Sequence, residues 1–469
     1  MRVMSCLLFL CALSFVQSAP EGARIGPLPG IDFPVNFKQY AGFLNASDTH
    51  KLFYWFVESQ RNPAEDPLVL WLTGGPGCSS LSALFMENGP FFISGAGEKL
   101  YENAYAWNKV ANMIFLESPA GVGFSYSTDG DIRTNDNKTA EENYRALKHF
   151  LQLYPEFSQS DFYLTGESYA GIYVPTLASW IIQDRKIKFK GLAIGNGFHS
   201  AEAIYNSLPP FLYNHNLITE DLWADVVTCC KGNPTECDYF GMMTRNQTSF
   251  CYNTTINAIS NYEDYGLDPY DIYYSCDDTG QTSMYQRKMP RIMLQRFLGV
   301  EKTNNEPQST DPDPNACPVY NRTALYLNRP DVQRVLRVNP SAPWSMCNED
   351  MNETVYVSLY DNMDKQFADI FAQSQVRVLL YNGDTDTVCN SVANQRYARS
   401  LMRKQIEPMR PWTYAPTSPN VGGMVTRYDR LDYVTVRGAG HQVPSAKPGQ
   451  ALQIFANFLS NKPYDTPLE

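Results

Sequence analysis

A serine in the first half of the chain stands where it could act as a nucleophile. The stretch F-Y-L-T-G-E-S-Y-A-G, residues 162–171, reads as a strand, a turn of small residues and a helix, with Ser168 in the turn. Such a turn exposes a serine hydroxyl above the end of a sheet, where it can attack a carbonyl carbon. The pattern is G-x-S-x-A, because Ala170 replaces the second glycine of the usual motif. The interpretation of Ser168 as a nucleophile therefore depends on its position between a strand and a helix.

A serine hydroxyl needs a base to accept its proton, and the chain has only five histidines. His441 follows a strand-like stretch and the glycine-rich turn at residues 437–440, which is where enzymes with a serine turn of this kind present their base. We therefore predict that His441 is the base. The other four histidines are expected in solvated or structural positions: His50 in a polar turn, His149 on an exposed helix face, and His199 and His215 in structural roles.

The base needs a carboxylate that orients its ring and stabilises the imidazolium. In enzymes built on a serine turn, this acid lies between the serine and the histidine in the sequence. Residues 376–381 form an apolar, strand-like run, and the loop N-G-D-T-D follows it directly. Asp384 and Asp386 both lie in this loop, and spacing alone leaves both of them open.

The elements that must position these residues alternate between strands and helices. A chain in which strands and helices alternate forms a parallel sheet with helices on both faces, so we predict the α/β class. The expected strands are residues 51–58, 67–72, 110–117, 161–165, 189–195, 376–381 and 433–436. The expected helices are residues 141–153, 169–182 and one near residues 330–336.

The composition changes in the middle of the chain. Residues 197–328 are rich in Asn, Tyr, Cys and Pro and lack a clean alternation of strands and helices. We interpret this stretch as an inserted subdomain stapled by disulfides, which divides the core into residues 19–196 and 329–469. The basic stretch at residues 285–296 within it is predicted either to be cut during maturation into two disulfide-linked chains or to form a solvated basic helix.

The N-terminus and the cysteines indicate the secretory pathway. A basic start, an apolar run of about eleven residues and small residues at positions 16 and 18 predict a signal peptide over residues 1–18. The apolar run is too short to span a membrane. Nine of the 11 cysteines lie beyond this leader, an odd number that suggests four disulfides and one free thiol. Six glycosylation sequons are consistent with this compartment: Asn45, Asn137, Asn246, Asn253, Asn321 and Asn352.

Charge excludes one class of partner. The net charge is −11, whereas nucleic acids and anionic membranes attract clustered lysines and arginines. We therefore expect no nucleic-acid partner. No later apolar run is long enough to span a membrane, so no membrane span is expected either. No C-x-x-C pair is present, so nothing in the sequence supports a metal site, and no cofactor is expected.

Four motifs, taken together and in order, resemble the serine carboxypeptidases. They are W-L-T-G-G-P-G-C-S-S at residues 71–80, G-E-S-Y-A-G at 166–171, G-D-T-D at 383–386 and G-A-G-H-Q-V-P at 438–444. The resemblance covers nearly the whole chain after the leader. It implies an α/β-hydrolase core with a mostly helical cap, and the removal of single residues from peptide C-termini at acid pH through an acyl-enzyme on Ser168.

The resemblance also assigns roles to individual residues. It implies that Asp386 is the catalytic acid and that the backbone N–H groups of Gly75 and Tyr169 form the oxyanion hole. Residues expected near the carboxylate of the substrate are Trp71, Thr73, Gly74, Glu87 and Glu167. One position departs from the family pattern, because Thr73 stands where the family has an asparagine that helps to bind this carboxylate. A threonine keeps a hydroxyl donor but has a shorter reach.

The resemblance implies a disulfide pairing and several alternatives in function. The implied pairs are Cys78–Cys347, Cys229–Cys251, Cys230–Cys237 and Cys276–Cys317, with Cys389 free. The substrates would be peptide or protein C-termini, in a lysosomal or secreted setting. A homodimer and luminal enzyme partners are also compatible with the resemblance. The alternatives are an acyltransferase on the same triad and a protein that protects other luminal enzymes.

Overall fold

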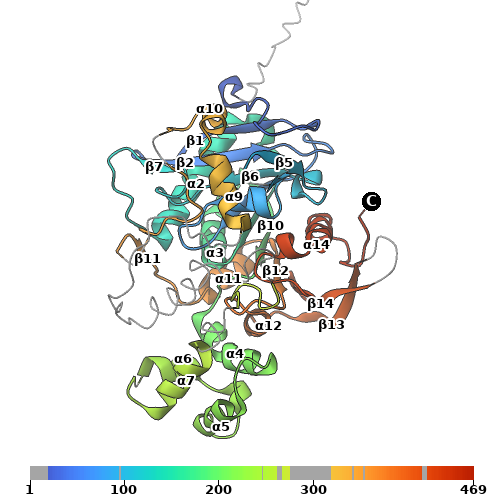
Figure 1. The fold of residues 1–469 in the computed structure, drawn as a ribbon. Coiled ribbons are helices and arrows are strands. Elements are labelled where there is room, and N and C mark those ends of the chain that lie inside the picture. The colour runs from blue at the N-terminus through green and yellow to red at the C-terminus, as the bar shows by residue number, and fades with distance from the viewer. Residues whose placement is uncertain are drawn as a thin grey trace, which may run out of the picture.

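A large mixed sheet forms the centre of the molecule (Figure 1). The computed structural model describes residues 20–94, 97–245, 247–260, 267–274, 318–340, 343–351, 354–414 and 420–468. Ten strands follow the order β1 (Gln39–Asn45), β2 (His50–Val57), β6 (Asn112–Leu116), β3 (Leu68–Thr73), β9 (Asp161–Glu167), β10 (Lys188–Gly195), β12 (Arg377–Gly383), β15 (Leu431–Val436), β14 (Asn420–Tyr428) and β13 (Gln405–Tyr414). An eleventh, β7 (Tyr126–Ser127), pairs with β2.

The six strands from β6 to β15 run parallel, and antiparallel strands extend the sheet at both edges. All six residues of β3 and all five of β6 are buried, as expected for parallel strands covered on both faces. The predicted α/β class with a mostly parallel central sheet is therefore confirmed. Because the strands are parallel, their carboxyl ends share one edge, and the loops that carry the predicted chemistry leave from that edge.

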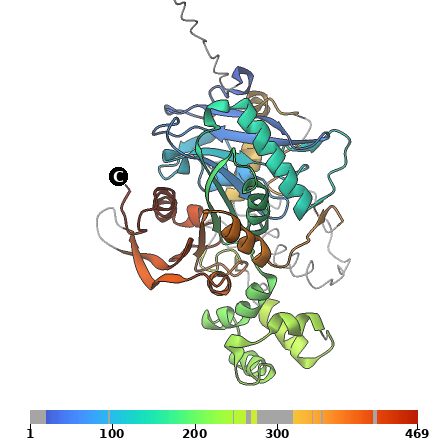
Figure 2. The same cartoon turned by 180° about the vertical axis from the view of Figure 1, so that it is seen from behind.

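Helices cover both faces of the sheet (Figures 1 and 2). Side chains of β2 alternate between the two cores, with Tyr54 and Phe56 in one and Phe53, Trp55 and Val57 in the other. The first core also contains α2 (Asp136–Leu153), α3 (Ala170–Ile181), α11 (Asp364–Gln373) and α12 (Ser391–Ser400). The second contains α1 (Ser80–Met86), α9 (Pro318–Leu327), α10 (Pro330–Leu336) and α14 (Pro448–Ser460).

The structure differs from the predicted elements in two places. The helix predicted from residue 141 begins at Asp136, because the side chain of Asn135 caps it by accepting a hydrogen bond from the Lys138 N–H (2.9 Å). The hairpin of β13 and β14 was not predicted at all. Strand β13 contains Pro408 and Pro411 and only one of its residues is buried, so it lacks the apolar alternation that identifies a strand.

Most of the described part of the predicted insertion is helical and forms a lobe beside the sheet (Figure 1), but its last helix, α9, packs in the second core. Its main helices are α4 (Ala201–Asn214), α5 (Glu220–Cys229), α6 (Tyr239–Arg245) and α7 (Phe250–Ser260). Two of the implied disulfides, Cys229–Cys251 and Cys230–Cys237, are present in it. The implied pair Cys276–Cys317 and the basic stretch at residues 285–296 lie outside the described residues.

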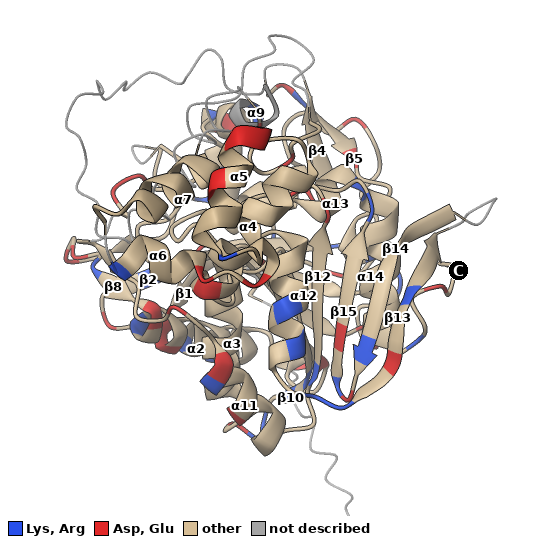
Figure 3. Cartoon of the chain, turned by 90° about the horizontal axis from the view of Figure 1, so that it is seen from below, with Lys and Arg blue, Asp and Glu red and all other residues tan. Residues whose placement is uncertain are grey.

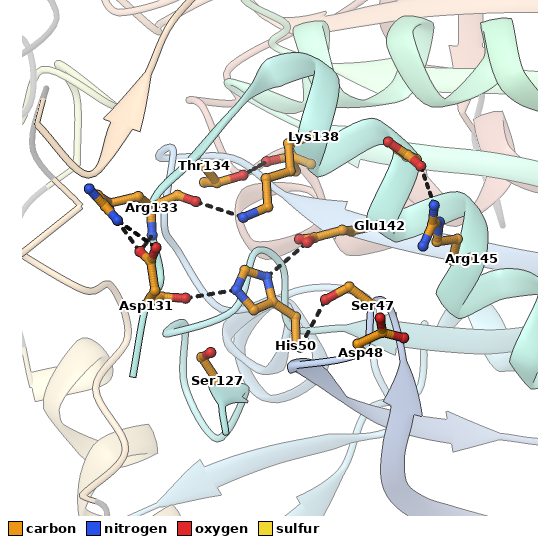
Figure 4. A network of polar contacts seen from close by, with 12 residues as sticks. Ser47, Asp48, His50, Ser127, Asp131, Arg133, Thr134, Lys138, Glu142 and Arg145 are labelled. Carbon is orange, nitrogen blue, oxygen red and sulfur yellow. Dashed lines mark hydrogen bonds and ion pairs between the residues drawn. The ribbon is translucent and has the colours of Figure 1, made fainter. Parts of the chain in front are cut away.

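His50 is not in a solvated turn, as the sequence suggested, but is buried at the start of β2 (Figure 4). Its Nε2 lies 2.7 Å from the carbonyl oxygen of Asp131, which can only accept, so Nε2 carries a proton. Its Nδ1 lies 2.8 Å from Oε1 of Glu142, which is also buried. These contacts attach the loop before α2, and α2 itself, to β2.

Figure 3 shows only basic residues on α12, whereas β13–β15 carry both acidic and basic residues. Among the described residues, no helix is long and apolar enough to cross a membrane. Three of the sequon asparagines, Asn45, Asn137 and Asn253, are exposed. The residues Asn246 and Asn352, and the side chain of Asn321, lie outside the part of the chain that is described.

Candidate active site

Ser168 lies on a strained turn at the carboxyl end of β9. Its φ is +64°, in the left-handed region that residues other than glycine rarely adopt, and α3 begins two residues later. The turn is held by hydrogen bonds from the N–H groups of Gly171 (2.8 Å) and Phe198 (2.9 Å) to the Ser168 carbonyl. The Ser168 N–H donates to the carbonyl of Gly195 on β10 (3.2 Å). This is the geometry that presents a serine hydroxyl above a sheet edge.

His441 and Asp386 meet on neighbouring loops, after β15 and β12. Nδ1 of His441 lies 2.7 Å from Oδ2 of Asp386, and both side chains are buried. Because a carboxylate only accepts, Nδ1 donates, which leaves Nε2 as the acceptor on the neutral ring. Among the described residues, that buried Nε2 has no hydrogen-bond partner. The imidazole is therefore oriented as a general base requires.

The structure separates the two aspartates that spacing left open. Asp386 is fully buried and contacts His441, whereas Asp384 is partly exposed and accepts from the Gly438 N–H (2.7 Å). The Asp386 carboxylate also accepts from the backbone N–H groups of Val388 (2.8 Å) and Cys389 (3.2 Å). Asp386 is thus the carboxylate that orients the imidazole.

Asn196, which the sequence analysis did not single out, connects the serine turn to the acid loop. It follows Gly195, the residue that accepts from Ser168. Its side chain donates from Nδ2 to Oδ2 of Asp386 (2.8 Å) and accepts from the Gly383 N–H (3.0 Å). The contact joins residues 190 positions apart, so no local sequence signal could have identified it.

The loop after β3 packs directly against the serine turn. A Cβ added to Gly74 would lie 2.3 Å from the Tyr169 nitrogen and 2.9 Å from the Ser168 Cβ, so only glycine allows this approach. Gly75 has a φ of +116°, which also favours glycine. The predicted oxyanion donors, the N–H groups of Gly75 and Tyr169, therefore come from two segments in contact.

A buried carboxyl, Glu117, is hydrogen-bonded to the loop after β3. Ser79, which caps α1, donates its hydroxyl to Oε1 of Glu117, and the Trp344 indole N–H donates to the same oxygen (2.7 Å). The Phe124 N–H donates to Oε2 (2.6 Å). Burial raises the pKa of Glu117 to about 7. The disulfide Cys78–Cys347 is present and fixes the same loop to the segment that carries Trp344.

Two carboxyls expected near the substrate, Glu87 and Glu167, lie side by side in the interior. Burial raises the pKa of Glu87 to about 7. Burial is the main cause that raises the pKa of Glu167 well above its ordinary value, and the negative charge of Glu87 raises it further. At acid pH the pair therefore retains protons that it can donate.

Thr73 pairs with Glu167 across β3 and β9, so it lies next to these carboxyls. Its Oγ1 accepts from the indole N–H of Trp71 (2.9 Å), and its own N–H donates to the hydroxyl of Ser80 (3.1 Å). Trp71 is completely buried, so its link to the site is this hydrogen bond to Thr73.

Residues 267–274 of the insertion contact the loops of the base and the acid. The Tyr270 carbonyl accepts from the His441 N–H (2.7 Å), and its ring lies edge-on to the imidazole at 4.8 Å. The Thr385 hydroxyl donates to Asp271 (2.8 Å). Burial raises the pKa of Asp268 to about 7. The sequence contained no signal for these contacts, because the insertion has no clean periodicity.

Comparison with known proteins places these observations in a family. The sequence model described as serine carboxypeptidase matches residues 29–461. A "Serine carboxypeptidase ctsa-4.1" from Caenorhabditis elegans is 39% identical, covering 100% of both chains. The "Lysosomal protective protein" of Mus musculus is 40% identical, covering 98% of this chain and 99% of its own. The crystal structure of Kex1, a prohormone-processing carboxypeptidase from Saccharomyces cerevisiae, shares the fold with a TM-score of 0.73 at 21% identity, covering 95% of this chain and 96% of that one.

Proposed function

Because the chain belongs to the serine carboxypeptidase family, we propose that it removes single residues from peptide C-termini through an acyl-enzyme on Ser168. The observation that carries this assignment of residues is the 2.7 Å contact between His441 and Asp386, on loops at the same sheet edge as the Ser168 turn. His441 is the base and Asp386 is the acid that orients it.

The reaction has two halves. In the first, Ser168 Oγ attacks the scissile carbonyl while Nε2 of His441 takes its proton, and the N–H groups of Gly75 and Tyr169 hold the oxyanion. The same proton then passes to the leaving amine, which departs as a free amino acid. In the second half, water attacks the acyl-enzyme, again with His441 as the base, and the shortened peptide leaves with a new carboxylate.

Recognition of the C-terminus is assigned to the carboxyl pair and its neighbours. Protonated Glu87 or Glu167 donates a hydrogen bond to the substrate's carboxylate, with the Thr73 hydroxyl and the Gly74 N–H beside it. The raised pKa values of the two carboxyls support this role, because an ionised carboxyl would repel the substrate. Because the pair loses its protons as the pH rises, recognition of the C-terminus is favoured at acid pH.

The test is digestion of one defined peptide at pH 5, followed by mass spectrometry. Stepwise loss of single residues from the C-terminus is expected, and the Ser168→Ala variant should show none. Internal cleavage, or undiminished activity in the variant, would refute the proposal. A fluorophosphonate probe should label the wild type at Ser168 and leave the variant unlabelled.

The remaining proposals concern the setting of the enzyme. We place it in the lysosome or outside the cell, with residues 1–18 removed, because a lysosomal relative matches almost the entire chain. That relative's name also supports a second candidate function, the protection of partner proteins. An acyltransferase would use the same triad with an alcohol or amine in place of water, and product analysis with an acyl donor distinguishes it.

A further inference from the structure

Asp136, the first residue of α2, is a fully buried carboxyl that the proposed mechanism does not use. Its Oδ1 accepts hydrogen bonds from two phenols, those of Tyr356 (2.7 Å) and Tyr169 (2.9 Å). Its Oδ2 accepts from the backbone N–H groups of Leu359 (2.6 Å) and Tyr360 (3.2 Å). Among the described residues, all four hydrogen bonds to the carboxyl come from donors, which is the arrangement that a carboxylate satisfies.

One of these partners belongs to the proposed oxyanion hole. Tyr169 follows Ser168, and its backbone N–H is one of the two proposed donors. The direction of that N–H depends on the peptide plane between the two residues. A strained residue such as Ser168, at φ +64°, keeps its conformation only where the surroundings over-determine it. The 2.9 Å contact from the Tyr169 hydroxyl to Asp136 is one such constraint.

We propose that Asp136 is a positioning residue that holds the Tyr169 N–H, through the Tyr169 hydroxyl, in the direction that the oxyanion requires. The inference rests on the proposed function. Asp136 is itself fixed by α2 and by the segment of β11 (Tyr356–Val357), which pairs with β8 (Thr134–Asn135) directly before α2. The first residue of α2 therefore fixes the serine turn from which α3 begins.

Removing Asp136 itself would take the shared acceptor from two phenols and two backbone N–H groups at once and endanger folding, so the test removes single phenols instead. Tyr169→Phe and Tyr356→Phe each delete one hydroxyl from the same Asp136 oxygen, and both side chains are buried. Only Tyr169 carries a proposed oxyanion donor. Both variants lose one hydrogen bond to Asp136 and differ in what that bond positions; Tyr169→Phe also loses a contact with Ser358, which a third variant controls.

For Tyr169→Phe we expect kcat to fall about 10- to 100-fold while KM changes less than about twofold, because the donor acts on the transition state. For Tyr356→Phe we expect kcat to stay within about twofold of the wild type. Both variants should lose a similar amount of Tm. Equal kcat in the two variants, whether both fall or neither does, would overturn the inference.

The Tyr169 hydroxyl also lies 2.8 Å from the Ser358 hydroxyl, which gives a second control. Ser358→Ala removes that contact and leaves the bond to Asp136, so kcat should change little. If this variant reproduced the loss seen in Tyr169→Phe, the anchor would be Ser358 and not Asp136.

The labelling rate of Ser168 by a fluorophosphonate separates this inference from the proposed function. The probe's oxygen must occupy the same hole, so Tyr169→Phe should be labelled about 10-fold more slowly than Tyr356→Phe. If the wild type is labelled but does not shorten peptides, the proposed function fails, and the labelling rates still decide the inference. A wild type that neither hydrolyses peptides nor reacts with the probe would overturn both.

Discussion

Asp384 and Asp386 are two residues apart on one loop, yet only Asp386 contacts the imidazole of His441. We expect Asp386→Asn to lose on the order of 10⁴ in kcat, because an amide in this position favours the wrong tautomer of the base. Asp384→Asn should retain most of the activity, since its carboxyl accepts from the backbone N–H of Gly438 and does not contact the imidazole. Steady-state kinetics of the two variants measure the difference. A larger loss in Asp384→Asn would contradict the assignment of the acid.

The carboxyl pair predicts the pH dependence of substrate binding. The pKa of Glu87 is raised to about 7 by burial, so its proton is present below that pH and is lost as the pH rises through it. KM for peptides with a free C-terminus should therefore climb steeply between about pH 5 and 7. Glu167→Gln, which introduces a permanent donor, should flatten the climb.

C-terminally amidated peptides are the control, because they carry no carboxylate to be repelled. Their KM should rise little over the same range. A profile in Glu167→Gln identical to that of the wild type would remove the pair from the recognition of the C-terminus.

At the residue scale, the sequence identified groups that carry their own local pattern. Ser168 and His441 each stand in a recognisable turn beside a strand, and the resemblance to the family added Asp386. Asn196, Glu117 and Asp136 could not be found in this way. Their partners are brought to them by the fold, 190 positions along the chain from Asn196 and 227 from Glu117.

At the scale of elements, buried parallel strands were predicted well because they are short apolar runs followed by turns. Strand β12 was expected to end at residue 381 and continues to Gly383. The start of helix α2 was missed because the first turn of the helix is polar and contains no apolar stripe. The edge hairpin escaped prediction because exposed edge strands with prolines do not follow the alternation of a half-buried strand.

The contact of His50 with Glu142 predicts a stability effect between β2 and α2. Removing either partner leaves the other polar group buried without it, so His50→Ala and Glu142→Ala should each cost about 3–5 kcal/mol of unfolding free energy. The double variant should lose clearly less than the sum of the two. Urea unfolding of the four proteins measures the coupling.

The same helix supplies a matched control in the pair Arg145–Glu141, whose side chains are 55% and 39% exposed. Exposed pairs of this kind contribute less than about 1 kcal/mol, so a cycle on these residues should show little coupling. Equal coupling in the two cycles would contradict the importance of burial at His50.

At the scale of the whole molecule, the α/β core was predicted correctly. The bounds of the insertion, residues 197–328, stay a prediction. The strand–helix alternation indicated the core, and the change in composition indicated the insertion. What the sequence could not give is how the insertion meets the core. Several contacts of residues 267–274 with His441 and the acid loop use backbone groups, such as the carbonyl of Tyr270, and the residue type does not reveal such contacts.

The disulfide Cys78–Cys347 joins the loop of the proposed oxyanion hole to a segment 269 residues later. Around it, the Ser79 N–H donates to the Met346 carbonyl (2.7 Å) and the Asn348 N–H to the Gly77 carbonyl (2.9 Å). The bridge therefore closes a large part of the chain and fixes the loop locally. Its loss typically costs about 2–5 kcal/mol, a large share of a total stability of roughly 5–15 kcal/mol.

We accordingly expect Cys78→Ser to be secreted poorly and to be inactive, whereas Cys389→Ser should be secreted normally. Cys389 is a buried free thiol, and burial raises its pKa well above the ordinary value, so it should resist alkylation in the folded protein and react after unfolding. Secretion assays and peptide mapping with an alkylating reagent measure both effects. Normal secretion and activity of Cys78→Ser would contradict the role of the bridge, and a map in which Cys389 is disulfide-linked would contradict the pairing.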